Sequence, residues 1–339
     1  MATIKDIAEK AGISPAAVSR ILNNDTSLSV SPSTRERVIH IAKEMNYKKS
    51  KPVKHNDFKL GIVQWFSAEE EAKDSYYLFV RNGIEDFCKK NHIKIERAFK
   101  SDKDYTESIK NVNGLICIGK FSSEEIDDFY RICPNVVFLD MEIKDYNIST
   151  LTMDFKNAVY DALQYLYDLG HREIAFLGGA EYVGEYKKEK VIDERNLAYV
   201  SFMKKKHLNY KEYMWEGTFD VASGYEMMTR LLSTDKHPTA VFASSDSIAF
   251  GAMKAIKDHG LSIPDDISII GFNDIEMSAF TSPALTTIHA PAYDMGQHGA
   301  NLIYVASNLS ISTPIKVKIP CTLVQRDSCA TPKSLSNQK

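Results

Sequence analysis

The chain has 339 residues, of which 44% are hydrophobic and 26% charged, a composition typical of a globular protein with two or three domains. Its 42 Lys and Arg residues nearly balance its 45 Asp and Glu residues, so the net charge of −3 excludes a polycation. No apolar run approaches the roughly 18 residues of a membrane span, and the first ten residues lack the segments of a signal peptide. Because the five cysteines are scattered and form no CxxC pair, we expect a cytoplasmic protein with reduced thiols.

Charge is unevenly distributed along the chain. Residues 1–59 carry eleven Lys and Arg and six Asp and Glu, a net charge of +5, which leaves −8 for the remainder. A basic segment on an acidic body favours binding of a polyanion at one end of the molecule.

The first predicted elements are two short helices within residues 3–22, joined by a tight turn at Gly12. Apolar residues recur at helical spacing on both sides of this glycine, whose backbone tolerates a sharp turn. Ser14 caps the second helix, and Pro15 fits its first position because the N–H that proline lacks has no partner there. The pattern predicts a helix-turn-helix, with an ordinary helical hairpin as the alternative.

The second helix has two distinct faces. Val18, Ile21 and Leu22 form its apolar inner face. The residues left on its outer face are Pro15, Ala16, Ser19, Arg20 and Asn23. In a helix-turn-helix, this outer face is the one that enters the major groove of DNA.

A third helix and a linker complete the N-terminal part. Ser31 and Pro32 repeat the start signal for a helix over residues 32–46, and three such helices can enclose one small core. Residues 1–47 are therefore predicted to form an all-α domain. Residues 48–58, KKSKPVKHNDF, have four lysines, a proline and little apolar content, which predicts a linker.

From residue 59 onward, strands alternate with helices. The strand-like runs are residues 59–66, 93–99, 114–120, 135–140, 151–155, 173–179, 239–246 and 267–274. The helical patterns are residues 76–91, 123–131, 156–169, 193–206, 247–259 and 294–307. This alternation predicts parallel sheets covered on both faces, and its restart near residue 151 predicts two similar α/β lobes.

Open parallel sheets bind ligands beyond the carboxyl ends of their strands. Polar segments at these ends are residues 67–77, 119–122, 140, 178–181, 244–247 and 272–274. Two lobes that face each other with these segments would enclose a small polar ligand.

Several motifs resemble those of the LacI/GalR family of bacterial repressors and follow one another in the same order as in that family. The head motif is TIKDIAEKAGISPAAVSRILN at residues 3–23, and LGHREIAFLGG lies at 169–179. Further motifs are DERNLAY (193–199), ASSDSIAFGAMKAI (244–256), DISIIGFNDI (266–275), PALTTI (283–288) and LVQRDS (323–328). The segments at 74–86 and 110–120 resemble the branch of the galactose-operon and evolved β-galactosidase repressors.

The resemblance implies a helix-turn-helix head followed by an α/β body of two periplasmic-binding-protein-like lobes with parallel sheets. It implies an effector-binding and dimerisation domain over residues 59–329, and we expect residues 330–339 to be disordered. The first lobe is expected at about 59–152 and 290–313, and the second at about 153–289 and 314–329. No C-terminal leucine heptad is evident, which favours a homodimer over a tetramer.

The resemblance also implies which residues contact double-stranded operator DNA. Pro15, Ala16 and Arg20 match base-reading positions, and the Arg20 guanidinium can bind guanine O6 and N7 together. The positions that match phosphate contacts are Thr3, Ser14, Ser19, Asn23 and Tyr47. The alternative for Arg20 is a phosphate contact only.

For the effector, the resemblance implies a sugar, with galactose or a galactoside expected. The assigned residues are Tyr76, Tyr77, Arg81, Asp140, Arg195, Phe219, Ser245 and Asn273. The fork of Arg195 suits vicinal hydroxyls, Asp140 can accept from sugar hydroxyls, and Phe219 matches a stacking aromatic. Packing in the core is the alternative for Phe219 and for one of the tyrosines. No cofactor and no metal are expected.

The linker departs from the family pattern. Relatives usually have a hinge helix with an Ala-x-x-Leu motif, whose leucine wedges into the minor groove. The connection at residues 48–58 is shorter than the usual connection in the family, and it lacks that motif. We therefore expect the lysine-rich linker to contact phosphates, with strongly salt-dependent binding and little DNA bending.

Two other function classes remain as alternatives. One is a sugar-binding transport protein, and the other is a sugar-modifying enzyme such as a kinase on an α/β scaffold. The chain has neither the GxxxxGK[ST] loop nor the GxSxG elbow, so the sequence favours a regulator without enzymatic activity.

Overall fold

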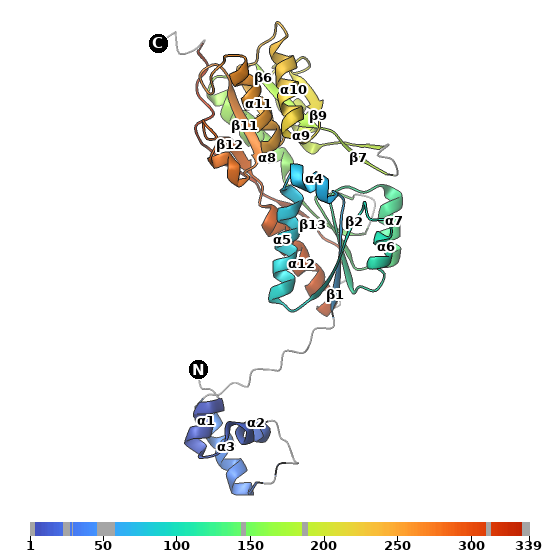
Figure 1. Ribbon diagram of the computed structural model, residues 1–339, viewed down its shortest axis with the longest axis vertical. Helices are drawn as coiled ribbons and strands as arrows, with labels where there is room; N and C mark the ends of the chain where they lie inside the picture. Colours follow the sequence, from blue (N-terminus) through green and yellow to red (C-terminus); the bar gives the residue numbers. More distant parts are fainter. Residues whose placement is uncertain are drawn as a thin grey trace. The chain divides into compact units, whose positions relative to one another are not determined.

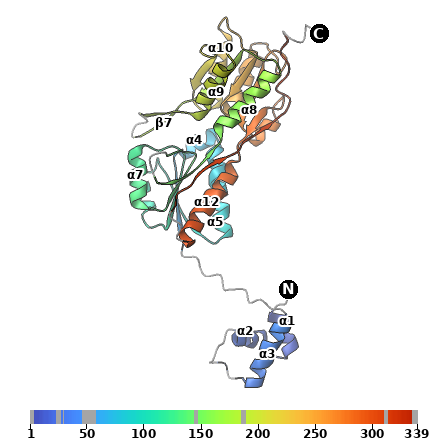
Figure 2. The same ribbon diagram turned by 180° about the vertical axis from the view of Figure 1, so that it is seen from behind.

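The computed structural model describes residues 4–22, 28, 30–45, 58–143, 147–184, 189–309 and 313–333 (Figures 1 and 2). The chain divides into two compact units, Met1–Asn56 and Asp57–Lys339, which confirms a small head and a larger body. The predicted linker, apart from Phe58, lies outside the described residues. The prediction that this linker has no hinge helix therefore concerns residues outside the described part of the chain.

The head contains three helices, as predicted. They are α1 (Ile4–Ala11), α2 (Pro15–Leu22) and α3 (Pro32–Glu44). Ser14 Oγ accepts from the backbone N–H of Ala17 at 3.2 Å, and Ser31 caps α3 in the same way through Thr34. Gly12 has a φ of 66°, so its left-handed backbone turns the chain between α1 and α2.

One small core holds the head together. Its fully buried side chains are Ile7, Val18, Ile21 and Val38, one or two from each helix. These side chains lie on the inner face that the helical spacing predicts, so α2 keeps its opposite face toward solvent.

The first lobe is built on a six-stranded parallel sheet in the order β13-β5-β4-β3-β1-β2. Its strands are β1 (Lys59–Gln64), β2 (Lys94–Phe99), β3 (Gly114–Ile118), β4 (Val136–Leu139), β5 (Ser149–Met153) and β13 (Lys316–Ile319). The helices α5 (Tyr76–Lys90) and α12 (Ala292–Leu309) cover one face, and α6 (Tyr105–Ser108) and α7 (Ser123–Ile132) cover the other (Figure 1). The short helix α4 (Ala68–Lys73) follows β1.

The second lobe has a six-stranded sheet in the order β14-β12-β11-β10-β6-β9, parallel except for β14. Its strands are β6 (Ile174–Gly179), β9 (Met214–Gly217), β10 (Ala240–Ala243), β11 (Ser268–Asn273), β12 (Thr286–His289) and β14 (Thr322–Val324). The helices are α8 (Phe155–Asp168), α9 (Glu194–Lys205), α10 (Val221–Leu232) and α11 (Asp246–Asp258), with the 3-10 turn η2 (Glu276–Ala279) after β11. A separate hairpin consists of β7 (Glu181–Val183) and β8 (Glu189–Val191).

The chain crosses between the lobes at residues 154, 290–291 and 320–321. The last crossing corrects one predicted boundary, because β13 pairs with β5 and so belongs to the first lobe rather than the second. The start of the disordered tail was also predicted too early, at residue 330. The backbone of Ala330 bonds to Ser268 and His171, and Lys333 pairs with Asp266 at 2.5 Å.

Several elements of the body were not predicted: α4, α6, β9, α10, η2 and the β7–β8 hairpin. The helix α10 contains Gly224 in its first turn, which weakens the helical signal of the sequence. A Cβ at Gly224 would lie 2.2 Å from the carbonyl oxygen of Ile248, so glycine is required for α10 to approach α11.

Candidate functional site

A cavity lies between the two lobes of the body, at the carboxyl ends of their strands. In this arrangement of the lobes its volume is about 30 Å³, below the roughly 300 Å³ at the lower end of small-molecule sites. Six predicted effector residues line it: Tyr76, Tyr77, Asp140, Arg195, Phe219 and Asn273. Four further lining residues were not predicted: Phe66, Asp74, Phe155 and Glu181.

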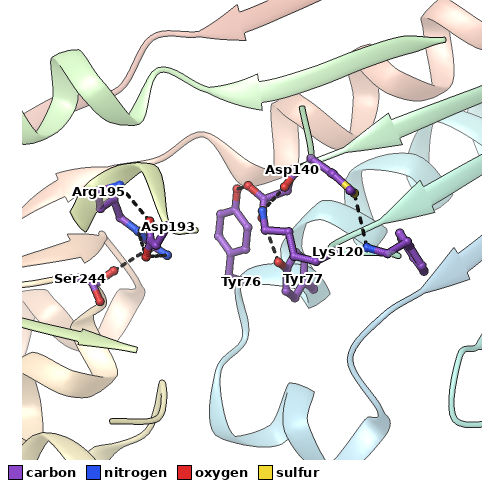
Figure 3. A network of polar contacts seen from close by, with 9 residues as sticks. Tyr76, Tyr77, Lys120, Asp140, Asp193, Arg195 and Ser244 are labelled. Carbon is purple, nitrogen blue, oxygen red and sulfur yellow. Dashed lines mark hydrogen bonds and ion pairs between the residues drawn. The ribbon is translucent and has the colours of Figure 1, made fainter. Parts of the chain in front are cut away.

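Asp140 is the polar centre of the first-lobe wall (Figure 3). Its carboxylate accepts from the hydroxyls of Tyr76 at 3.3 Å and Tyr77 at 2.8 Å, and from Lys120 Nζ at 2.7 Å. Asp140 follows β4 with a φ of 67°, an uncommon conformation that directs the carboxylate toward these partners. Burial, followed by the Asp140 charge, raises the pKa of both tyrosines well above 10, so both keep their protons as donors.

Arg195 is the polar centre of the second-lobe wall. Its Nε lies 3.0 Å from both carboxylate oxygens of Asp193, and its Nη1 donates to the backbone oxygen of Ser244 at 2.7 Å (Figure 3). The guanidinium lies 4.9 Å from the ring centroid of Phe219 and 5.1 Å from that of Phe155. Burial lowers the pKa of Arg195, but the charge and hydrogen bond of Asp193, together with the charges of Glu181 and Asp140, more than offset this, so the pKa is raised and the cation persists.

Two further carboxyl groups face the cavity without an ion pair among the described residues. Within the part of the chain that the structure describes, Asp74 accepts a hydrogen bond only from the backbone N–H of Tyr76, at 3.0 Å, and burial raises its pKa. Loss of solvent raises the pKa of Glu181 to about 7, although the nearby Lys120 acts in the opposite direction. These two acids lie beside the pairs Asp140–Lys120 and Asp193–Arg195, so the walls carry more carboxyl groups than cations.

The structure does not bring two predicted effector residues into the cavity. Arg81 lies farther along α5, where its Nη2 is held by both carboxylate oxygens of Glu71 at 2.7 and 2.8 Å. Ser245 is the N-cap of α11, and its buried hydroxyl accepts from the N–H of Ile248. Arg81 therefore forms an ion pair with Glu71, and Ser245 caps α11.

The overlooked residues Asp74, Lys120 and Glu181 have one signal in common. Each lies in a polar segment that follows a strand, where the position rule for parallel sheets predicts ligands. Phe155 carries no such signal, because its position at the start of α8 resembles any core aromatic.

The outer face of α2 is the candidate DNA-binding surface of the head. Ser14, Pro15, Ala16 and Arg20 are exposed and Ser19 is half-buried, while Val18 and Ile21 of the same helix are buried. The structure thus places five of the predicted DNA contacts on one side of one helix. The other three, Thr3, Asn23 and Tyr47, lie outside the described residues.

Two properties of the whole chain complete the description. All five cysteines are free, and three of them are buried. Among the helices that the structure describes, none has both the length and the apolar character needed to cross a bilayer.

Comparisons with known proteins match both parts of the chain. Residues 3–50 match the bacterial regulatory proteins of the lacI family, and residues 163–329 match the periplasmic binding protein-like domain. The chain is 34% identical over 340 residues to the HTH-type transcriptional regulator GalR of Streptococcus thermophilus, covering 97% of this chain and 99% of that one. It is 33% identical over 341 residues to the HTH-type transcriptional repressor MelR of Bacillus subtilis (strain 168), with 97% and 98% covered.

Solved structures share the fold. The lac repressor dimer bound to operator and the anti-inducer ONPF superposes with a TM-score of 0.70 at 24% identity, covering 97% of this chain and 99% of that one. The complex of the transcriptional regulator CelR with cellobiose has a TM-score of 0.70 at 21% identity, covering 97% and 100%. At these identities, the likeness shows the arrangement of a helical head and two α/β lobes.

Proposed function

The chain belongs to the LacI family of bacterial regulatory proteins, and from this premise we propose the ligand that regulates it and the residues that respond. It is a DNA-binding transcriptional regulator, as its relatives are, and not an enzyme. We propose that it represses genes of sugar use, and that galactose or a galactoside bound between the lobes lowers its affinity for operator DNA.

The observation that carries this proposal is that Asp140 and Arg195 lie on opposite walls of the same cavity. Asp140 is fixed by two tyrosines and a lysine of the first lobe, and Arg195 by Asp193 and a backbone oxygen of the second. One wall therefore offers an acceptor and the other a forked donor, which together suit the hydroxyls of a neutral sugar. Phe219 adds an apolar surface for the carbon face of the ring.

Galactosides are favoured within the sugars for two reasons. Residues 74–86 and 110–120 resemble the galactose-operon branch, and relatives from two organisms carry the name GalR. Asn273 lines the cavity, and its amide can bond to a neutral hydroxyl.

The response requires a ligand that contacts both lobes. A sugar held by Asp140 and Arg195 stabilises the arrangement of lobes in which both can reach it, and disfavours others. In a homodimer on a two-fold operator, such a shift alters the placement of the two heads. By linkage, DNA must then weaken sugar binding by the same factor.

On DNA, we propose that Arg20 reads guanine, while Pro15 and Ala16 contact apolar base atoms such as a thymine methyl. Thr3, Ser14, Ser19, Asn23 and Tyr47 would contact phosphates, which position the head without reading sequence.

A thermal-shift screen of the full chain tests the sugar proposal. Galactose, galactosides and sugar phosphates are added at increasing concentration, since a ligand that binds the folded state raises its stability by RT ln(1+[L]/Kd). We expect a galactoside to raise the Tm of the wild type and of Arg230→Ala, an exposed arginine on α10, but not of Arg195→Ala. A response of Arg195→Ala equal to that of the wild type would reject the site.

A further inference from the structure

A basic surface lies on the second lobe, apart from the residues that line the effector cavity. It consists of Arg172, which follows α8, and of Lys204, Lys205 and Lys206 at the end of α9, and we call it the α8–α9 surface. The two helices pack side by side on one face of the second-lobe sheet (Figure 2). Lys205 lies ten residues after Arg195 on α9, which is about 15 Å along the helix axis.

Aromatic rings hold three of the four cations in place. The guanidinium carbon of Arg172 lies 3.7 Å from the ring centroid of Tyr167, and Nζ of Lys206 lies 4.3 Å from the same centroid. Nζ of Lys205 lies 5.8 Å from the ring centroid of Tyr160. Arg172 Nη1 also donates to the backbone oxygen of Tyr167 at 2.7 Å. The rings attract these cations and restrict their rotamers, so the charged groups are ordered before a partner arrives.

The positive charge of the α8–α9 surface is not neutralised within the described part of the chain. No carboxylate there lies within ion-pair distance of its four cations, whereas Arg195 and Arg326 have carboxylate oxygens at 2.9 and 2.6 Å. Of the acids next to the surface in sequence, Asp168 accepts from Gln164 at 2.6 Å, and Glu173 is exposed to solvent. The four cations therefore repel one another and attract an anionic group.

The charge of the surrounding chain indicates which kind of anion fits this surface. Outside residues 1–59 the chain has a net charge of −8, so the α8–α9 surface is a local exception on an acidic body. A DNA duplex carries negative charge along its whole length and would meet repulsion beyond the surface. A short acidic segment of a protein covers the basic residues alone and avoids that repulsion.

The spacing of the cations suits carboxylate side chains. Tyr160 and Tyr167, which lie under Lys205 and Lys206, are seven residues apart on α8, or about 10 Å. Carboxylates two turns apart on a helix, or three residues apart on an extended chain, have the same spacing. We propose that the α8–α9 surface docks a short acidic segment of a partner protein. This docking does not depend on the sugar, because the residues of the surface do not line the cavity.

Fluorescence anisotropy of fluorescein-labelled octaglutamate tests the proposal. The full chain is first saturated with an operator duplex selected from random DNA, so that its basic head is occupied and cannot bind the peptide. We expect Lys205→Gln/Lys206→Gln to bind octaglutamate about fivefold more weakly than the wild type at low ionic strength. Lys89→Gln/Lys90→Gln, which changes two exposed lysines at the end of α5, is the matched control and should bind as the wild type does.

A second variant separates loss of charge from loss of folding. Lys205→Arg/Lys206→Arg keeps both charges, so it should bind octaglutamate as the wild type does. The proposal is wrong if the wild type does not bind the peptide, if the two Gln variants lose equal affinity, or if the Arg variant loses as much as its Gln counterpart. It is also overturned if a short duplex of unrelated sequence binds at Lys205 and Lys206 more tightly than octaglutamate, because the surface would then be a nucleic-acid site.

Discussion

Asp193 holds Arg195 from two residues away, with its two carboxylate oxygens each 3.0 Å from the arginine Nε. The same carboxylate accepts from the backbone N–H of Arg195 at 2.9 Å, so it caps α9 and fixes the guanidinium at once. Because the Nη1 group is also bonded to Ser244, the arginine is set before any ligand arrives. The binding proposal depends on this preset geometry.

Replacement of this carboxylate should weaken sugar binding without removing the helix cap. Asp193→Asn keeps a capping oxygen but loses the charge that orients Arg195, so we expect about tenfold lower affinity for galactoside, or about 1.4 kcal/mol. Titration calorimetry measures the change. Asp220→Asn, the same substitution at the N-cap of α10, is the control and should leave affinity unchanged. Equal losses in the two variants would show that the cap, not the orientation of Arg195, matters.

Loss of the cation beside Asp140 should destabilise the first lobe. Lys120 and Asp140 have side chains that are only 12% and 5% exposed, so Lys120→Met leaves a buried carboxylate without its partner. Breaking a pair of this kind typically costs about 3–5 kcal/mol. Urea unfolding of the full chain should show most of that loss, and the double variant with Asp140→Asn should recover part of it. A loss below about 1 kcal/mol would show that the tyrosine hydroxyls alone satisfy Asp140.

Affinity for a neutral sugar should rise with pH. Loss of solvent raises the pKa of Glu181 to about 7, so near neutral pH this group is partly protonated. A hydroxyl that donates to the carboxylate favours its ionised form, so binding lowers the pKa and releases a proton. The affinity should therefore increase from pH 6 to pH 8, and Glu181→Gln should flatten the profile. Calorimetry in buffers of different ionisation enthalpy detects the proton, and a steeper profile in the variant contradicts the assignment.

Arg20 should govern sequence discrimination by the head. Arg20→Ala removes a bidentate donor to guanine, which is worth about 1–3 kcal/mol, whereas Arg20→Lys keeps the charge without the fork. Fluorescence anisotropy on an operator selected from random DNA should show both variants binding it more weakly. Binding to unrelated DNA should change less in Arg20→Lys than in Arg20→Ala. If Arg20→Lys retains full discrimination, the contact is to phosphate.

Local rules of the sequence predicted the head and most of the sheets. Ser14 with Pro15 and Ser31 with Pro32 fix where two helices begin, because capping depends on a few neighbouring residues. The buried strands are continuous apolar runs, so they were found as well. The helix α10 was missed, because the packing that requires Gly224 comes from α11, elsewhere in the chain.

The site was predicted less completely, for a related reason. Arg195 was found through the motif around it and Asp140 through its place at the end of a strand, and the structure places both in one cavity. Arg81 was misassigned because its partner Glu71 lies in α4, a helix that the sequence pattern did not predict. Glu181 was not singled out because its place depends on the β7–β8 hairpin, whose pairing is set by tertiary contacts.

The central claim is that a sugar bound through Arg195 controls DNA binding, and one titration tests it most directly. Anisotropy on the selected operator is measured for the wild type and Arg195→Ala, with and without saturating galactoside. We expect both proteins to bind the operator alike without sugar, and the sugar to weaken only the wild type, by about 5-fold to 150-fold. An operator affinity that the sugar leaves unchanged in the wild type, or lowers equally in Arg195→Ala, would contradict the account.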